Sequence, residues 1–299
     1  MSRRSATATA PRTYERNWDN QGALLGAFPD DIPDDTEELE LYGCFYRTKK
    51  ITIPPAALGK LAKLKKLHIG MARITTLPES LGKLTALEEL DLGSAEQLTT
   101  LPASVGKLRS LTNLNLQFCH RLKALPASIG KLAKLESLQA QPSGLRSVPA
   151  TLWNATRLTF LGLPPEIKKL PPGIGKLRAL EHLELGVRAF DSVATELPKL
   201  TKLKKVEFCY DRAGKLPDAI GDLVGLEELN ADSMNLTSLP ASLVNLRELR
   251  MLQVMGNELT ELASIVEALP KLEYVSMSRN KLPAKEQRAV NAILKRRSS

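Results

Sequence analysis

Apolar residues recur along the chain in runs of the form LxxLxL, with polar or small residues between them. One run holds Leu87, Leu90 and Leu92, and the next holds Leu111, Leu114 and Leu116. Alternate side chains of a strand face opposite ways, so the end of each run predicts a short strand with its leucines on one face. Eleven such runs begin at Thr36, Leu64, Leu87, Leu111, Leu135, Leu158, Leu180, Leu203, Leu226, Leu249 and Leu272.

A second motif precedes many of these runs. Leu77-Pro78-Glu79-Ser80-Leu81-Gly82-Lys83-Leu84 recurs at 101–108 and again at 125–132. The proline predicts a turn that leads into a short helical or 3-10 segment. Because no single repeat can bury its own leucines, neighbouring repeats must stack, and their strands then form one parallel sheet.

The combined pattern LPxxIGKLxxLxxLxLxxNxL resembles the leucine-rich-repeat family over roughly residues 36–282. It is similar to the Ras-group intracellular repeats of plants and animals. The 24-residue units resemble repeats of plant disease-resistance receptors and of type III effectors of plant-pathogenic bacteria. This resemblance implies an α/β solenoid, a right-handed leucine-rich-repeat horseshoe with a parallel concave sheet and short helical or 3-10 convex segments.

The family also implies an asparagine or cysteine three residues after the last strand leucine, where it bonds the backbone of the next coil. Four positions fit this expectation: Cys44, Cys119, Asn257 and Asn280. Three do not: Ala72, Ala95 and Met234. The sequence therefore predicts an incomplete ladder of such bonds.

The ends of the chain differ from the repeats. Residues 1–14 have few apolar groups and predict a disordered tail. Residues 15–35 predict an N-terminal cap built on Trp18, Leu24, Leu25 and Phe28, ahead of about eleven repeats of 22–28 residues in 36–282. Residues 283–299 predict a C-terminal capping helix with a basic tail.

Composition limits the setting of the protein. The three cysteines are widely spaced, which suits a reducing compartment and a cytoplasmic location. No stretch approaches the ~18 apolar residues of a membrane span, and the N-terminus has no apolar run like that of a signal peptide. We expect a monomer in the cytoplasm, with delivery into a host cell as the second interpretation if the chain is a bacterial effector.

Nothing in the motifs predicts chemistry. His68, His120 and His182 fall in different repeats, and leucine follows each repeated Gly-Lys, where a phosphate loop needs serine or threonine. HExxH, GxSxG and CxxC do not occur. The sequence therefore predicts no enzyme, no catalytic or metal-ligating residue, no cofactor and no small-molecule substrate.

Charge is divided between the two faces of the predicted solenoid. The formal net charge is +9, yet the strand positions that face the concave side hold eight acidic residues and two lysines. Those acids would repel a phosphate backbone, which disfavours nucleic acid in the concavity. Exposed convex lysines offer the alternative function of binding nucleic acid or an anionic surface: Lys60, Lys83, Lys107, Lys131 and Lys176.

We therefore predict a protein–protein interaction module or scaffold that acts in signalling or in a host–pathogen interaction. A regulatory subunit that wraps an enzyme is a narrower version of the same hypothesis. The expected partner is a protein with a basic segment next to an apolar one, since acidic, aromatic and methionine side chains occupy the concave positions. The candidate partner-binding residues are Asn115, Gln139, Phe160, Glu184, Glu207, Tyr210, Asp232, Met251, Met255 and Tyr274.

Overall fold

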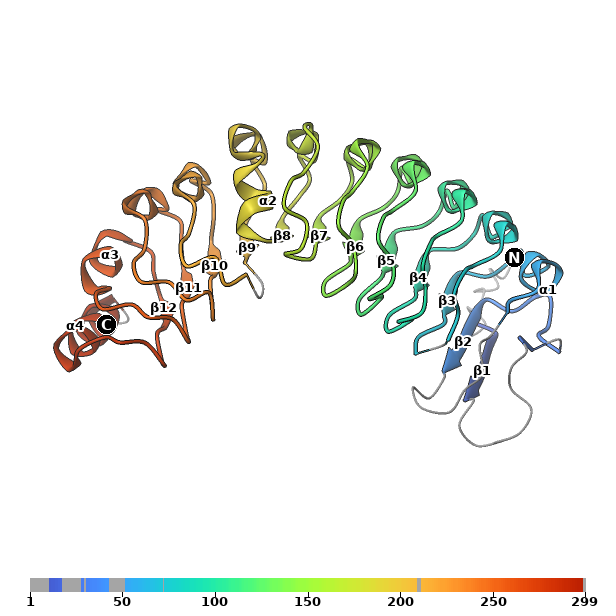
Figure 1. Cartoon of the computed structure of the whole chain (residues 1–299), viewed down its shortest axis with the longest axis horizontal. Helices are drawn as coiled ribbons and strands as arrows, with labels where there is room; N and C mark the ends of the chain where they lie inside the picture. Colours follow the sequence, from blue (N-terminus) through green and yellow to red (C-terminus); the bar gives the residue numbers. More distant parts are fainter. Residues whose placement is uncertain are drawn as a thin grey trace, which may run out of the picture.

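The computed structural model describes residues 11–17, 28–29, 31–42, 52–71, 73–208 and 211–297. Its described strands form one open sheet of twelve parallel strands, which follow one another in sequence order. The chain bends into an arc, with the strands along the inner side and the helical segments along the outer side (Figure 1). This arrangement confirms the predicted α/β solenoid with a parallel concave sheet.

Each of the eleven leucine runs contains a strand that begins at the third residue of the run. Each strand pairs in register with the next one along the chain, as Leu161 of β7 does with Leu183 of β8. The strands are β2 Glu38–Tyr42, β3 Lys66–His68, β4 Glu89–Asp91, β5 Asn113–Asn115, β6 Ser137–Gln139, β7 Phe160–Gly162, β8 His182–Glu184, β9 Lys205–Glu207, β10 Glu228–Asn230, β11 Met251–Gln253 and β12 Tyr274–Ser276.

One strand precedes these eleven. β1, Thr13–Asn17, pairs in parallel with β2, so it begins two residues before the position at which we predicted the cap to start. The expectation of a disordered tail as far as residue 14 is corrected at Thr13 and Tyr14, because pairing with β2 and packing of Tyr14 on the core order them. Phe28 of the predicted cap is buried. Residues 1–10, Trp18, Leu24 and Leu25 lie outside the described residues.

The described convex segments are mostly short, and six of them are 3-10 turns that a proline precedes. Proline fixes the extended backbone from which such a turn starts. The segments are α1 Pro55–Gly59, η1 Glu79–Lys83, η2 Ala103–Lys107, η3 Ala127–Lys131, η4 Ala150–Asn154, η5 Ile174–Lys176, α2 Val187–Asp191, η6 Ala194–Lys199, η7 Asp218–Asp222, η8 Ala241–Asn245, α3 Ala263–Ala268 and α4 Ala284–Arg297.

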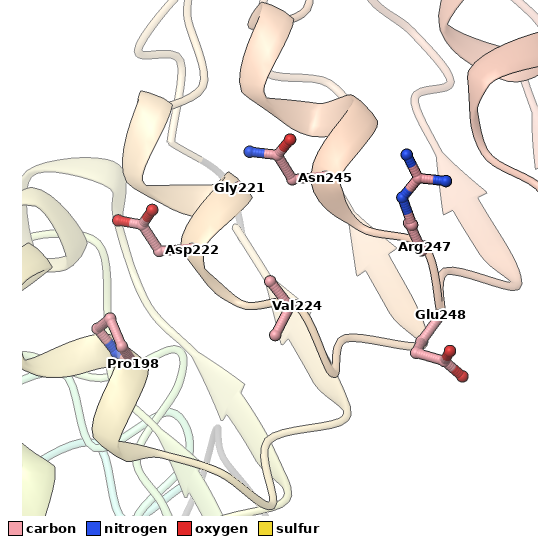
Figure 2. Close-up of a pocket in the computed structure, with 7 residues that line it drawn as sticks. All are labelled: Pro198, Gly221, Asp222, Val224, Asn245, Arg247 and Glu248. Carbon is pink, nitrogen blue, oxygen red and sulfur yellow. The ribbon is translucent and has the colours of Figure 1, made fainter.

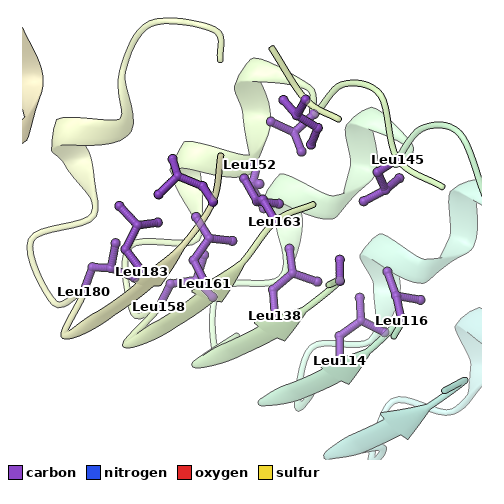
Figure 3. Close-up of a cluster of buried hydrophobic side chains, with 14 of the residues drawn as sticks. Leu114, Leu116, Leu138, Leu145, Leu152, Leu158, Leu161, Leu163, Leu180 and Leu183 are labelled. Carbon is purple, nitrogen blue, oxygen red and sulfur yellow. The ribbon is translucent and has the colours of Figure 1, made fainter. Parts of the chain in front are cut away.

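Leucine fills the space between the two sides. The leucines of neighbouring repeats lie in parallel rows, as Figure 3 shows for Leu114, Leu138, Leu161 and Leu183. Each of these side chains is buried, which stabilises the fold by roughly 1.5–3 kcal/mol per side chain. Every row continues into the next repeat, so the core is as long as the sheet.

Asparagine bonds join the coils near the C-terminus. Asn257 is buried, and its Oδ1 accepts hydrogen bonds from the backbone N–H groups of Met234 and Leu236 at 2.9 and 3.0 Å. Its Nδ2 donates to the carbonyls of Ala231 and Val254 at 2.8 and 3.0 Å. Asn280 repeats the pattern one coil later, with bonds from Leu259 N and to Val254 O, among others. In the middle of the array Cys119 holds this position, and its Sγ donates to Leu92 O at 3.2 Å.

The chain turns sharply three residues beyond several strand ends. The eighth residue of the run then adopts a left-handed backbone conformation, which is costly for any residue except glycine. Among the described residues glycine occupies the position once, at Gly256 with φ 71°. Elsewhere a side chain tolerates it: Met71, Ser94, Phe118, Ser233 and Arg279.

The final helix, α4, forms within the predicted C-terminal capping segment and packs on α3. The carboxylate of Glu286 in α4 accepts hydrogen bonds from the backbone N–H groups of Leu262 and Ala263, at the start of α3. Val290 and Ile293 of α4 are buried. The helices of the described residues include none that is both long and apolar enough to cross a membrane.

Candidate functional site

Uniform register arranges the concave side chains in rows that cross the sheet. The first residues of β7 to β10 form one row: Phe160, His182, Lys205 and Glu228. The third residues form the adjacent row: Gly162, Glu184, Glu207 and Asn230. Paired strands lie about 4.8 Å apart, so residues one repeat apart in sequence are direct neighbours in space.

The structure divides the predicted partner-binding residues into three groups. Asn115 and Gln139 are neighbours on β5 and β6. Phe160, Glu184 and Glu207 lie together on β7 to β9. The third group lies at β10 to β12 and beyond their ends: Asp232, Met251, Met255 and Tyr274. Tyr210 lies outside the described residues.

His182 lies at the centre of the second group. Its Nε2 is 3.4 Å from Oε1 of Glu184 and 3.0 Å from Oε1 of Glu207. Phe160 meets the imidazole edge to face, with ring centroids 4.6 Å apart. Lys205 reaches over the same carboxylate, with its Nζ 2.7 Å from Oε1 of Glu207.

These contacts give the two carboxylates different protonation behaviour. The imidazole of His182 and the ammonium of Lys205 lower the pKa of Glu207 to about 2, although burial opposes them. Burial and the negative charge of Glu207 raise the pKa of Glu184. These two effects outweigh the positive charge of Lys205, which favours the charged form of Glu184.

The third group combines an acidic side chain, which a backbone hydrogen bond holds in place, with exposed apolar surface. Asp232 accepts a hydrogen bond from the backbone N–H of Met255 at 2.6 Å, while burial raises the pKa of its carboxyl. Tyr274 is 52% exposed, and Met251 beside it on β11 is half-buried. This end of the concave face thus offers an aromatic ring and a methionine close to an acidic side chain.

The contact of His182 with two acidic side chains was not predicted from the sequence. Glu207 follows it by a full repeat in the sequence, and only the strand register brings the two together. The signal was present in the repeat length, because residues one repeat apart must be neighbours. The same logic finds a second group, in which His68 lies 3.6 Å from Glu40 and 3.1 Å from Glu89.

Among the described residues, three exposed large apolar side chains were not predicted from the sequence: Met71, Phe118 and Val224. Met71 and Phe118 are each 44% exposed, and both occupy the left-handed turn position beyond a strand end. They lie on repeats near β3 and β5, far along the array from Tyr274. Both side chains therefore form separate apolar surface at the turns that border the concave sheet.

Cys119 and His120 are adjacent in sequence but do not form a reactive pair. Cys119 is buried, and burial raises the pKa of its thiol to about 12, whereas His120 is exposed. A thiol in this state is not a nucleophile at neutral pH.

The convex side has its own surface features. The five predicted convex lysines are all exposed. An open depression of about 600 Å³ lies where η7 and η8 lead into the following loops, lined by Asp222, Val224, Arg247 and Glu248 among others (Figure 2). None of the predicted partner-binding residues lines it.

Comparison with known proteins supports the repeat architecture over part of the chain. A family model described as a leucine-rich repeat region matches residues 114–215. This match covers about a third of the chain, and it agrees with the repeated leucine motif and with the solenoid fold. A search of curated protein sequences gave no significant match.

Three solved structures illustrate the likeness of fold. The internalin InlF of Listeria monocytogenes has a TM-score of 0.57 at 21% identity, over 87% of this chain and 79% of that one. A TDR receptor has a TM-score of 0.60 at 25% identity, over 83% of this chain and 44% of that one. The ectodomain of the Arabidopsis receptor kinase HAESA, in complex with an IDA peptide hormone, has a TM-score of 0.53 at 24% identity, over 83% and 43%.

Proposed function

We propose that the protein is a recognition module that binds a protein partner on the concave face of strands β8 to β12. The single observation that carries this proposal is the order of side chains across those strands: partly buried acidic side chains on β8 and β9 are followed by apolar side chains on β11 and β12. The fold likeness to a receptor ectodomain that holds a peptide hormone supports a role in binding polypeptide.

The acidic part favours a basic segment in the partner. Lys205 contacts both Glu207 and Glu228, at 2.7 and 3.6 Å, so one lysine is shared among the acidic side chains of this part of the face. An arginine or lysine from a partner would supply further positive charge. The side chain of Glu228 is 42% exposed and is accessible to the same segment.

The apolar part favours an anchor next to that basic segment. Tyr274 is exposed on the final strand, and tyrosine is among the residues that contribute most to the affinity of protein interfaces. Met251 pairs with it in register, so the two side chains form one continuous surface. A partner that places an apolar residue here would bury both.

The test is affinity capture from lysate with a concave double variant, Glu228→Lys with Tyr274→Ala. Both side chains are exposed, so neither change should unfold the array. The matched control is a convex double variant, Lys107→Glu with Lys131→Glu. A protein that the wild type and the convex variant retain and the concave variant loses supports the proposal, whereas equal capture by all three contradicts this placement.

The convex lysines favour a second candidate function. They are exposed on successive segments, so a phosphate backbone or an anionic surface could contact several at once. In that case nucleic acid would bind with a steep dependence on salt, and the convex variant would lose it. A cytoplasmic location and a signalling or host–pathogen setting stay predictions from the sequence.

A further inference from the structure

We propose that His182, Glu184 and Glu207 form a binding site for one divalent cation of the zinc type. The site goes beyond partner recognition, because it needs no second protein. It lies on two neighbouring strands, β8 and β9, whose parallel pairing fixes the positions of all three residues.

The spacing of the donor atoms fits tetrahedral zinc. Bonds of about 2.0–2.2 Å from zinc to nitrogen and oxygen place two ligand atoms of a tetrahedron about 3.3–3.5 Å apart. Nε2 of His182 lies 3.4 Å from one carboxylate oxygen and 3.0 Å from the other. One ligand atom from each of the three residues lies within 4.8 Å of the other two. With small side-chain rotations the three residues would supply three ligands, and water would occupy the fourth tetrahedral position.

The hydrogen bonding of the imidazole nitrogen is a second observation, independent of the spacing of the donor atoms. Nε2 of His182 is buried and makes no hydrogen bond of good geometry with the described residues, a property that it shares with Nε2 of His68, but at His182 two carboxylate oxygens lie on the same side of that nitrogen. It lies close to two carboxylate oxygens without being directed at either. A buried polar atom without a partner is costly, and a cation between the imidazole and the carboxylates would satisfy it.

Neighbouring side chains hold two of the proposed ligands in place. The amide of Asn230 lies 3.3 Å from Oε2 of Glu207, so it orients the carboxylate while Oε1 faces His182. Phe160 holds the imidazole by its ring contact. The side chains of Glu184 and Glu207 are only 13% and 17% exposed, which limits competition from water.

The charge of the group also favours a cation. Two carboxylates face one lysine here, because Lys205 forms its ion pair with Glu207 while Glu184 lies beside them on β8. Lys205 can keep its contact with Glu207 when the same carboxylate binds a metal, because each oxygen carries more than one lone pair. A nitrogen ligand with two carboxylates suits zinc better than magnesium, which prefers oxygen alone.

The group around His68 provides a matched control. There Glu40 approaches Nδ1 and Glu89 approaches Nε2, so the two carboxylates lie on opposite sides of the ring. One ion cannot contact both while it is bound by a single imidazole nitrogen. The two histidines therefore differ in the one property that the proposed site requires.

The experiment is a zinc titration of the full chain after removal of metal with a chelator. A chromophoric zinc chelator reports competition, and four proteins are compared: wild type, His182→Ala, Glu184→Gln and His68→Ala. We expect one tight zinc ion in the wild type and in His68→Ala, and an affinity lower by on the order of 100-fold in the other two. Circular dichroism in the chelator verifies that all four are equally folded.

Cobalt provides a second readout on the ligand type. Co²⁺ bound to His182 and two carboxylates gives visible bands without the intense near-ultraviolet absorption of a cobalt–thiolate bond, which would instead indicate the cysteines. Equal zinc affinity in wild type and His182→Ala would overturn the proposal, as would a thiolate spectrum. Displacement of zinc by millimolar magnesium would overturn the assignment of the imidazole as a ligand.

Discussion

Replacing Asn257 by alanine tests whether side-chain bonds hold the C-terminal coils together. The amide of Asn257 bonds two backbone N–H groups and two carbonyls that belong to two successive coils. The residue is only 5% exposed, so water cannot easily take its place. Asn257→Ala leaves these backbone groups inside the protein without partners.

The expected loss of stability follows from the number of backbone groups that lose their hydrogen-bond partner. A buried donor or acceptor without a partner costs about 1–3 kcal/mol, and the two N–H groups of Met234 and Leu236 are the most demanding. Partial relaxation reduces the sum, so we expect Asn257→Ala to lower the free energy of unfolding by about 3 kcal/mol. Asn280 makes the same kind of bonds but is only half-buried, so Asn280→Ala should cost about 1 kcal/mol.

The assay combines two measurements. Urea denaturation followed by circular dichroism gives the loss of stability, and hydrogen exchange by mass spectrometry locates it. Faster exchange should be confined to the coils that contain residues 231–259, because each repeat contacts only its neighbours. If Asn257→Ala and Asn280→Ala differ by less than about 0.5 kcal/mol, burial does not decide the cost and the reasoning is refuted.

Three further predictions follow from the same structure. Gly256→Ala should lower stability by roughly 1 kcal/mol in thermal denaturation, because φ is 71° and the new Cβ would lie 2.9 Å from the hydroxyl of Ser233 in the preceding coil. As the control, Gly225→Ala should be neutral, since its new Cβ would have nothing within 4 Å. Cys119 should resist iodoacetamide at pH 7.5 and react only in urea, since its pKa is raised to about 12; peptide mapping that finds it alkylated in the folded protein would contradict this. Hydrogen bonds from backbone N–H groups lower the pKa of Glu286. The ionised carboxylate therefore stabilises the contact of α4 with α3 at any pH above the ordinary carboxyl pKa, and this stabilisation is lost as the pH falls through the lowered pKa. Hydrogen exchange in α4 should therefore rise relative to α3 on acidification, and Glu286→Gln should remove that dependence.

The leucine pattern was sufficient to predict the sheet, because burial of one strand face fixes both the period and the register. Each strand from β2 to β12 starts where the run placed it. β1 was missed because Thr13–Asn17 lacks the leucines of the repeat and is ordered by pairing with β2. α2 was missed because Val187–Asp191 forms a helical turn where other repeats have an extended return.

The candidate site was less accessible to sequence reasoning. The acidic positions of Glu184 and Glu207 follow from the period, but their contacts depend on side-chain directions that the period does not encode. His68 and His182 illustrate the limit, since both have two acidic neighbours and only His182 presents one nitrogen to both. The partner-binding role of these residues stays a prediction.

The slender convex segments have a consequence for the kind of object that the protein can hold. The curvature of a solenoid depends on how much wider its outer elements are than the spacing of about 4.8 Å between its inner strands. A complete α-helix is about 10 Å across, whereas most segments here are short 3-10 turns, which are tighter. Neighbouring coils therefore diverge only slightly, and the arc stays open (Figure 1). Such a shallow cradle suits an extended chain or a broad, gently rounded surface that lies across many strands, rather than a small sphere gripped on all sides.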